Sequence, residues 1–322
     1  MAGYNTIKGL RVKYLSADPS NPEDGQVWYN STTGKLRLQG IALAGSWASG
    51  GNMNTARRQI GGFGHTQTTG VAVCGQNPPA LSLTEEYNGS SWSEVNNSPQ
   101  ARIKPFANGS LTAGLIGGGE SGPSSTNTSV EYDGTNWAGG ATIPQNVTDG
   151  TSVGTQASAL MCVGSPSPTT AVFYYNGSSW TAGPAATPVK MASASGAGTS
   201  QTSAVVFGAT PNLTTTLEWD GSSWTAGGAL NTGRDRGASS VGSPATDALF
   251  FAGNNPSVTN ATEKYNGTSW ANQPNMAQAR RGLGGAGTSG SALAFAGYNG
   301  SDLATTEEFT GATTVTKNLS TS

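Results

Sequence analysis

The sequence predicts an all-β fold, a six-bladed β-propeller with four-stranded blades, on two repeat series. A seven-residue phrase of the type EYDGTNW occurs six times, and the last copy has diverged to EFTGATT. The glycine of the phrase stands at 89, 134, 177, 221, 267 and 311. A second glycine series stands at 64, 109, 154, 198, 242 and 287. Both series keep a period of 43 to 46 residues. A period near 45 residues is typical of four-stranded propeller blades.

Each repeat contains the elements of one blade in order. A segment of small residues, such as MASASGAG (191–198), is expected to form the crowded strand nearest the axis. A short apolar run follows, such as ALFFAG (248–253), which is too short for a helix and too apolar for an exposed strand. After a variable loop, a third strand ends at the aromatic residue of the phrase. Asn-Gly or Asp-Gly then makes a tight turn, and the Trp opens the outer strand.

The spacing also predicts how the ring closes. Trp47 lies 17 residues before Gly64, as Trp92 does before Gly109, but no inner strands precede Trp47. We therefore expect the strand at 45–47 to complete the sixth blade, whose own phrase has lost its Trp. The domains expected are an arm with a β-hairpin at 1–45 and the propeller at 46–322. The phrase tryptophans, each expected to pack against the neighbouring blade, are Trp47, Trp92, Trp137, Trp180, Trp224 and Trp270.

Composition excludes several function classes. Charged residues make up 11% of the chain, and 16 basic against 18 acidic residues leave a net charge of −2, which argues against nucleic-acid partners. The apolar runs are strand-sized, so no membrane insertion is expected, and the amino terminus lacks the apolar stretch of a secretory signal. Cys74 and Cys162 lie in apolar runs and are expected to be buried free thiols.

The residues offer little for catalysis. The chain has one histidine, His65, which gives a His-based triad little support. It excludes a metal centre that needs two or more histidines, so no metal and no cofactor are expected. Glycosidases need two carboxylates that converge on one bond, whereas the phrase glutamates share one repeat position and would be spread around the ring. These are Glu86, Glu131, Glu218 and Glu308. Four acidic residues break the repeat and are candidates only for that reason: Asp149, Asp235, Asp247 and Asp302. We therefore expect no enzymatic activity.

Seven arginines are the candidate ligand-binding residues. They precede the innermost strands of blades one, two, five and six, which are neighbours in a closed ring: Arg57, Arg58, Arg102, Arg234, Arg236, Arg280 and Arg281. One interpretation is an anion-binding crescent for an acidic glycan or a lipopolysaccharide phosphate. The alternative is ion pairing with glutamates of adjacent blades, which fits the third blade because it lacks both residue types.

Variable loops join the second and third strands on the same expected face as the arginines, for example at 117–128 and 253–260. The face is therefore predicted to contact a ligand or partner. Exposed loops also differ where nothing constrains them, and this alternative stays open.

Residues 46–311 resemble the kelch-type β-propellers. The resemblance rests on an apolar strand that ends in glycine, a loop, a Glu-aromatic-Asn/Asp sequence and a following Trp, as in EYDGTNW. The glycine pair of that family survives only at Gly117-Gly118, and Tyr174 replaces the glutamate in the third repeat. The resemblance implies the fold and not the function of any one subfamily.

A second resemblance concerns phrases such as NMNTARR (52–58) and TEEYNGSSW (84–92), which look like repeat-rich proteins of marine tailed phages. The leader at 16–38 resembles a segment of phage virion and tail-fibre proteins. The resemblance implies a non-enzymatic virion structural protein, in a tail fibre, appendage or capsid or tail decoration. Its arm would bind other virion proteins, its propeller face would meet a host-surface glycan, and it would be assembled in the host cytoplasm.

Three alternatives stay open. In the first, the chain is a carbohydrate-active enzyme, such as a glycan hydrolase or depolymerase, on the same scaffold. Alternatively it is a cellular adhesin or lectin. The arm could also pack on its own propeller instead of binding a partner.

Overall fold

The computed structural model describes residues 12–23, 25–39, 45–165, 170–312 and 316–319, and throughout these residues it is all-β, without helices. None of these residues belongs to a helix that could cross a membrane. The chain divides into two units, residues 1–45 with 311–322, and residues 46–310. Parts of the predicted arm (1–11, 24 and 40–44) and of the variable loop at 164–170 (166–169) lie outside the described residues.

The first unit contains one four-stranded sheet in the order β1-β2-β3-β32. Its strands are β1 (Lys13–Leu15), β2 (Val27–Asn30), β3 (Lys35–Gln39) and β32 (Thr316–Leu319). The expected hairpin is present, since β2 and β3 pair antiparallel with Asn30 opposite Lys35. The carboxy-terminal boundary differs from the expected one, because β32 pairs with β3 and thus joins the arm and not the propeller.

Asp18 holds the proline-containing segment of the arm against this hairpin. Its carboxylate accepts hydrogen bonds from Trp28 Nε1 at 2.9 Å and Asn30 Nδ2 at 2.7 Å, and Arg37 Nη1 lies 2.8 Å from it. The bonds from Asn30 and Trp28 lower the pKa of Asp18. The proline-containing segment is therefore tied to the sheet by a charge-assisted cluster.

The second unit contains six four-stranded antiparallel sheets, which we number I to VI. Sheet I has β5 (Gly61–Phe63), β6 (Val71–Val73), β7 (Thr84–Tyr87) and β8 (Trp92–Val95). Sheet II has β9 (Phe106–Ser110), β10 (Ala113–Gly117), β13 (Ser129–Tyr132) and β14 (Trp137–Gly139). Sheet III has β15 (Thr151–Thr155), β16 (Ser158–Cys162), β17 (Val172–Tyr175) and β18 (Trp180–Ala182).

Sheets IV to VI repeat this pattern. Sheet IV has β19 (Ser195–Ser200), β20 (Ser203–Phe207), β21 (Thr216–Trp219) and β22 (Trp224–Ala226). Sheet V has β23 (Ala238–Ser239), β24 (Leu249–Phe251), β27 (Thr262–Tyr265) and β28 (Trp270–Gln273). Sheet VI has β29 (Gly284–Thr288), β30 (Ser291–Phe295), β31 (Thr306–Thr310) and β4 (Ser46–Ser49). Two hairpins extend from sheets II and V: β11 (Glu120–Ser121) with β12 (Ser124–Ser125), and β25 (Asn254–Asn255) with β26 (Ser257–Val258).

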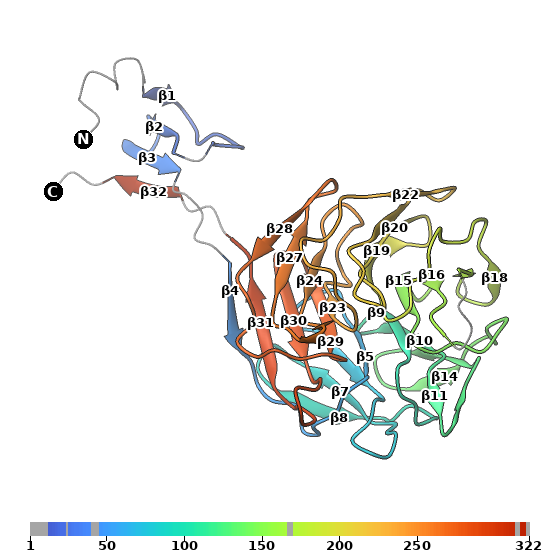
Figure 1. Ribbon diagram of the computed structural model, residues 1–322. Coiled ribbons are helices and arrows are strands. Elements are labelled where there is room, and N and C mark those ends of the chain that lie inside the picture. Colours follow the sequence, from blue (N-terminus) through green and yellow to red (C-terminus); the bar gives the residue numbers. More distant parts are fainter. Residues whose placement is uncertain (1–11, 24, 40–44, 166–169, 313–315, 320–322) are drawn as a thin grey trace. The chain divides into compact units, whose positions relative to one another are not determined.

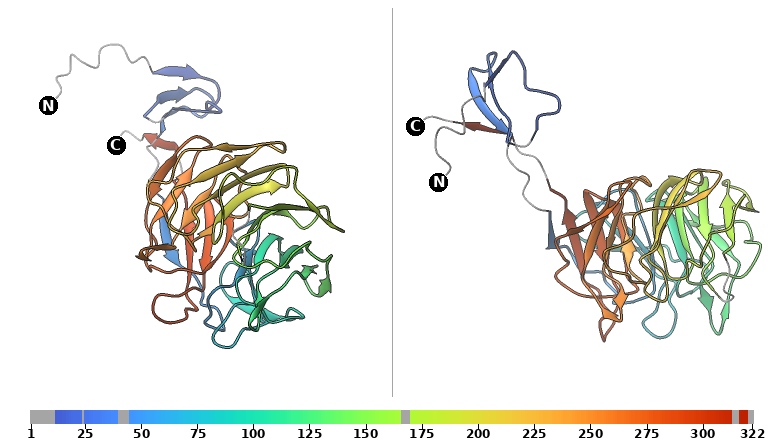
Figure 2. Two further views of the ribbon diagram at one scale, coloured as in Figure 1. Left: turned by 45° about the vertical axis from the view of Figure 1, so that its right-hand side comes forward. Right: turned by 45° about the horizontal axis from the view of Figure 1, so that its top comes forward.

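The first strands of the six sheets contact one another in sequence. β5 contacts β9, β9 contacts β15, and the series continues through β19, β23 and β29 back to β5. Figure 1 shows these strands toward the middle of the unit, with the outer strands at its rim, and Figure 2 shows the same unit from two further sides. The arrangement is β-propeller-like. β4 pairs with β31, with Trp47 opposite Phe309, which is the pairing that the spacing of Trp47 predicts.

The hydrophobic core lies between the sheets. Six clusters of buried side chains are present, and each joins two neighbouring sheets, including sheets VI and I. The second strands are buried on both faces as predicted, for example β6, β24 and β30. Cys74 and Cys162 are free and buried, as expected.

The repeated phrase forms a turn in which only the glycine takes a positive φ, from +87° to +97° in sheets I to V. The side chain before the glycine closes the turn, as where Asn88 Oδ1 accepts from the backbone N–H groups of Ser90 and Ser91 at 3.0 and 2.9 Å. Asp133 and Asp220 accept the equivalent bonds, which lower the pKa of both carboxyls. The repeated phrase is thus a structural turn.

The phrase tryptophans connect each sheet to the preceding one. Five indoles donate to a hydroxyl at the start of the third strand of that sheet: Trp47 to Thr262, Trp92 to Thr306, Trp137 to Thr84, Trp180 to Ser129 and Trp270 to Thr216. Trp224 donates instead to the carbonyl of Ala185. This is the contact with a neighbouring blade that the repeat predicts.

The phrase glutamates also connect neighbouring sheets. Tyr132 donates to Glu86 at 2.7 Å, and the equivalent bonds join Tyr87 to Glu308, Tyr175 to Glu131 and Tyr265 to Glu218. At the two remaining junctions both partners change together. Trp219 faces the sheet that carries Tyr174, and Phe309 faces the sheet that carries Lys264. The glutamate is retained only where a tyrosine hydroxyl is present to donate to it.

Candidate anion-binding pocket

The segments that lead into the first strands share one face with the loops between the second and third strands. Isolated bridges join the two sets of segments, pairing Arg58 with Gln76, Ile103 with Glu120, Thr148 with Ser165, Asp235 with Asn254 and Arg281 with Tyr298. The sequence predicts this common face, and the bridges confirm it.

Four of the seven candidate arginines do not reach that face. Arg57, Arg102, Arg234 and Arg280 are fully buried, with 0% exposure. Arg57 pairs with Glu85 at 2.6 Å, Arg234 with Glu263, and Arg280 with Glu307. Arg102 donates to the carbonyls of Gly118 and Thr128 at 3.1 and 3.2 Å. The expectation that these four bind a ligand is therefore wrong, because no solvent-borne anion can contact them.

The buried pairs differ from the expected ion pairs in their partners. Glu85 lies in sheet I, into which the segment of Arg57 leads, and not in an adjacent sheet. It is the residue before the phrase glutamate. Burial lowers the pKa of Arg57, while the adjacent Glu85 acts in the opposite direction. The second oxygen of Glu85 accepts the backbone N–H of Asn54 at 2.7 Å, so both carboxylate oxygens have donors. Such pairs need these additional bonds to offset desolvation.

The repeats contain a signal that would have revealed the buried pairs. Sheets III and IV carry Val147 and Met191 at the arginine position. Phe173 and Leu217 stand at the matching glutamate position, and each apolar residue belongs to the same core cluster as its partner. In sheets I, III, IV, V and VI the two positions therefore change together between an ion pair and an apolar contact, as expected where an unpaired buried charge is costly. Sheet II is the exception, because it combines Arg102 with Val130, and Arg102 donates to backbone carbonyls instead.

The other three arginines meet at one cavity of about 320 Å³. Arg58, Arg236 and Arg281 line it together with Gln59, Gln76, Lys104, Gly282 and Tyr298. We call this cavity the mouth pocket. Its residues come from the segments that lead into sheets I, II, V and VI, and from the loops after the second strands of sheets I and VI. The predicted gathering of arginines is thus present for three of the seven, from repeats one, five and six.

Charges around the mouth pocket are unevenly compensated. Arg58 Nη1 lies 2.6 Å from Asp302 Oδ1, and the Arg58 guanidinium lies 4.6 Å above the ring of Tyr298. Lys104 Nζ lies 2.8 Å from Glu120 and 3.4 Å from Asp149. Burial opposes the charge of Lys104, but these carboxylates outweigh it and raise the pKa of Lys104.

Arg236 and Arg281 have no such compensation. Within the described ranges, no carboxylate oxygen lies within 4.0 Å of either guanidinium. Both residues are only partly buried, so they can be reached from solvent. The mouth pocket therefore holds two arginines whose donors are available to an anion.

A ring of backbone hydrogen bonds supports the mouth pocket. One residue before each first strand has a φ between +52° and +62°: Gln59, Lys104, Asp149, Ser193, Arg236 and Gly282. Five of the six are joined head to tail to the preceding member, for example Gln59 N to Gly282 O at 2.7 Å and Gly282 N to Arg236 O at 2.8 Å. A left-handed backbone at five non-glycine residues is uncommon and persists only where its surroundings hold it. The side chains of Gln59, Lys104 and Arg236 therefore project from a rigid rim.

Arg236 belongs to this rim and not to the position of Arg58 and Arg281, although all three precede their repeat glycine by six residues. The segment between Arg236 and Gly242 contains one more residue than its counterparts between the rim and Gly64 or Gly287. The glycine spacing therefore misplaced Arg236 by one position. For the same reason Arg234 precedes its repeat glycine by eight residues, whereas the equivalent Arg57 precedes its glycine by seven.

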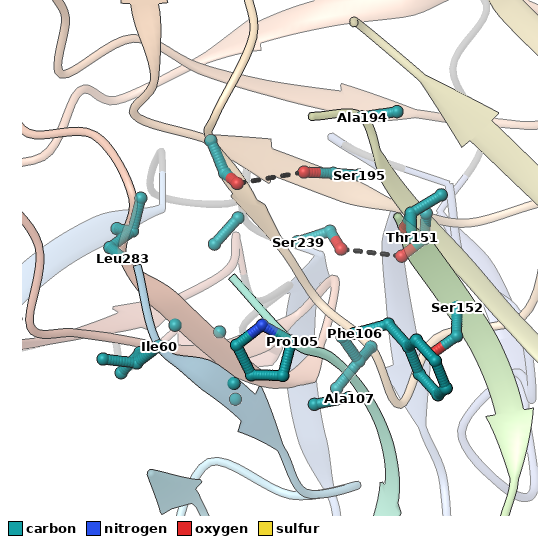
Figure 3. A pocket seen from close by; sticks show the side chains of 18 of the residues that line it. Ile60, Pro105, Phe106, Ala107, Thr151, Ser152, Ala194, Ser195, Ser239 and Leu283 are labelled. Atoms are coloured by element: carbon teal, nitrogen blue, oxygen red, sulfur yellow. Dashed lines mark hydrogen bonds between the residues drawn. The ribbon is translucent and has the colours of Figure 1, made fainter. Parts of the chain in front are cut away.

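A pocket of about 110 Å³ lies among the first strands. Glycine, alanine and serine dominate its lining, as the small residues of the sequence predict for strands that crowd together. Figure 3 shows Ser195 and Ser239 among the lining residues, with dashed hydrogen bonds to backbone carbonyls; the acceptors are Gly237 at 3.0 Å and Gly196 at 2.6 Å. The hydroxyls of Ser195 and Ser239 are thus already used within the fold.

Each of the four acidic residues that break the repeat has a different partner. Asp302 pairs with Arg58, Asp149 with Lys104, and Asp247 with Lys264 at 3.1 Å. Asp235 is buried and accepts a hydrogen bond from Thr210. No group of three potential metal ligands occurs among the residues that the structure describes. Burial lowers the pKa of His65.

Comparison with known proteins finds a likeness in structure but none in sequence. No protein-family model and no curated protein matches the sequence. The solved structure of YjhT matches with a TM-score of 0.64 and 12% sequence identity, and the match covers 82% of this chain and 99% of that chain. At this identity the likeness concerns the fold alone, and it supports a β-propeller-like, all-β architecture.

Proposed function

We propose that sheets I to VI are the blades of a closed six-bladed, kelch-like propeller. The support is the cyclic series of contacts between first strands, together with the core cluster that joins sheets VI and I. The same junction carries the hydrogen bonds from Tyr87 to Glu308 and from Trp92 to Thr306. The first and last blades therefore meet through the same kinds of contact as the others.

We further propose that the protein is a non-enzymatic structural component of a phage particle, in a tail fibre, appendage or decoration. Its propeller would display a binding face, and the first unit would attach to other virion proteins. The leader and the repeated phrases resemble phage virion proteins, and both ends of the chain contribute strands to the first unit. A host-surface glycan is the partner that an anion-binding face would suit.

One observation carries the binding role: Arg236 and Arg281 present uncompensated guanidinium groups to a preformed pocket on the face with the variable loops. Arginine is suited to bidentate binding of phosphate and carboxylate groups. Two partly exposed arginines without carboxylate partners on a rigid frame repel each other, so their arrangement gains stability when an anion binds.

Two measurements test the proposed function. Mass spectrometry of purified particles of the source phage should detect the chain, and its absence would refute the virion role. Purified protein should bind host envelopes without releasing glycan fragments. Glycan release that disappears in Asp149→Asn or Asp302→Asn, with Asp247→Asn as the control away from the pocket, would favour the carbohydrate-active enzyme instead.

A further inference from the structure

We propose that the mouth pocket binds a tetrahedral oxyanion, the phosphate or sulfate ester of a sugar, between Arg236 and Arg281. The inference deepens the proposed function and rests on it for the biological source of the ligand. It depends on where the compensated and uncompensated charges lie, on the directions of the donors, and on the size of the cavity.

The charges place the anion on the side of sheets V, VI and I. Four cations surround the pocket, and three carboxylates, Asp302, Glu120 and Asp149, lie against two of them. Arg58 is neutralised by Asp302, and Lys104 faces two carboxylates, so the side of Lys104 carries negative charge in excess. The remaining positive charge belongs to Arg236 and Arg281, which is where an anion is favoured.

The donors come from different sheets, which favours a tetrahedral group over a planar one. Arg236 precedes sheet V and Arg281 precedes sheet VI. Gln59 precedes sheet I, and its Oε1 already accepts from Gln76 Nε2 at 2.7 Å, which leaves the Gln59 amide N–H groups to donate. A planar carboxylate is satisfied by one guanidinium fork. The monoesters of phosphate and sulfate have three terminal oxygens that can meet three donors from three directions.

The cavity limits the size of the ligand. About 320 Å³ is at the lower end of the range of roughly 300–1,000 Å³ that is typical of small-molecule sites. The space suits one oxyanion and the sugar ring that carries it, and not a stretch of several residues of a glycan. A terminal or branch-point ester is therefore the form that fits.

The test uses the full chain and calorimetric titration at constant ionic strength with inorganic phosphate, sulfate and acetate, then with glucose 6-phosphate and glucose 6-sulfate. Phosphate and sulfate should bind at least about tenfold more tightly than acetate, since each hydrogen bond to a charged group contributes enough for such a factor. Arg236→Gln and Arg281→Gln should each weaken binding about tenfold or more. A preference between the two sugar esters identifies the source of the oxyanion.

Lys190→Gln is the matched control, because Lys190 is exposed, is not part of the pocket, and loses the same single charge. Equal weakening by Lys190→Gln, or equal binding of acetate, would overturn the inference, since either shows general charge attraction only. Melting temperatures of the variants must match that of the parent chain for the comparison to count. If they do not, Arg236→Lys and Arg281→Lys replace them, because they keep the charge and remove the fork.

The two proposals fail in distinguishable ways. No oxyanion binding by a chain that is present in particles and binds host envelopes would overturn the inference and leave the proposed function standing. Oxyanion binding by a chain that is absent from particles and does not bind envelopes would overturn the proposed function and support the pocket.

Discussion

Replacement of Trp47 by Ala tests whether β4 stabilises sheet VI and its contact with sheet V. The indole of Trp47 is half-buried and lies 5.2 Å from both Phe251 of sheet V and Phe309 of sheet VI, measured between ring centroids. Its Nε1 donates to Thr262 Oγ1 at 3.2 Å. The substitution therefore removes contacts with two sheets at once.

The magnitude follows from these contacts. The hydrogen bond contributes about 1 kcal/mol, and each aromatic pair contributes about 0.5–1.5 kcal/mol beyond area burial. Truncation of a fully buried Trp costs about 3–5 kcal/mol. Because Trp47 is only half-buried, we expect a loss of about 3 kcal/mol in the free energy of unfolding. Trp92 is 5% exposed, so Trp92→Ala should lie nearer the upper end of that range.

Trp137→Ala is the matched control. Trp137 is also half-buried, lies 4.7 Å from Tyr132, and donates to Thr84 Oγ1 and the carbonyl of Asn96 at 3.2 and 3.0 Å. Because the contacts are similar in number, the loss in the free energy of unfolding should agree with that of Trp47→Ala within about 1 kcal/mol.

The assay is urea unfolding followed by circular dichroism, with the free energy compared only where the denaturant slope is unchanged. A cost below about 1 kcal/mol for Trp47→Ala beside about 3 kcal/mol for Trp137→Ala would refute the reasoning, because β4 would then contribute little to sheet VI. A chain that begins at residue 52 and melts at the same temperature as the full chain would refute it independently.

Three further predictions concern the buried pairs, the tyrosines and the carboxy terminus. In urea unfolding, Glu263→Gln should destabilise the chain by about 3–5 kcal/mol, because it leaves Arg234 buried and unpaired. The joint replacement Arg234→Met with Glu263→Leu, which copies sheet IV, should destabilise the chain less. Burial and then the bond to Glu308 raise the pKa of Tyr87 to about 12, above about 10 in the unfolded chain, so its contribution is complete below pH 10 and is lost as pH rises to 12. Tyr87→Phe should therefore flatten the fall in stability over that window; an unchanged fall would contradict it. Removal of residues 311–322 should speed amide exchange in β3, which loses β32, and leave exchange in β24 unchanged.

Much of the fold follows from the repeat. Short buried runs, tight Asn-Gly turns and small residues near the centre each depend on neighbours within a few residues, so the sequence alone predicts β6, β24 and the phrase turns. The outer strand at Trp47 could also be placed, because its distance to Gly64 repeats that in complete units.

The separation of the arginines did not follow from the sequence as analysed. Arg57 and Arg58 are adjacent, as are Arg280 and Arg281, yet one of each pair is fully buried and the other lines the pocket. Extended backbone turns successive side chains to opposite sides, so neighbours of identical chemistry take opposite roles. The covariation of the arginine position with the residue before the phrase glutamate, which holds in every sheet but sheet II, contains the missing information.

The sequence by itself determined the period, the strands, the turns and the tryptophans that connect them, because each depends on local geometry repeated six times. Only the tertiary structure decided which arginines meet, that the carboxy-terminal strand joins β3, and that Arg236 projects from the rim beside Arg281. These depend on contacts between residues far apart in the chain, and a single added residue before Gly242 changes their register. Local chemistry constrains each sheet, whereas a binding pocket depends on how sheets from both ends of the repeat array are brought together.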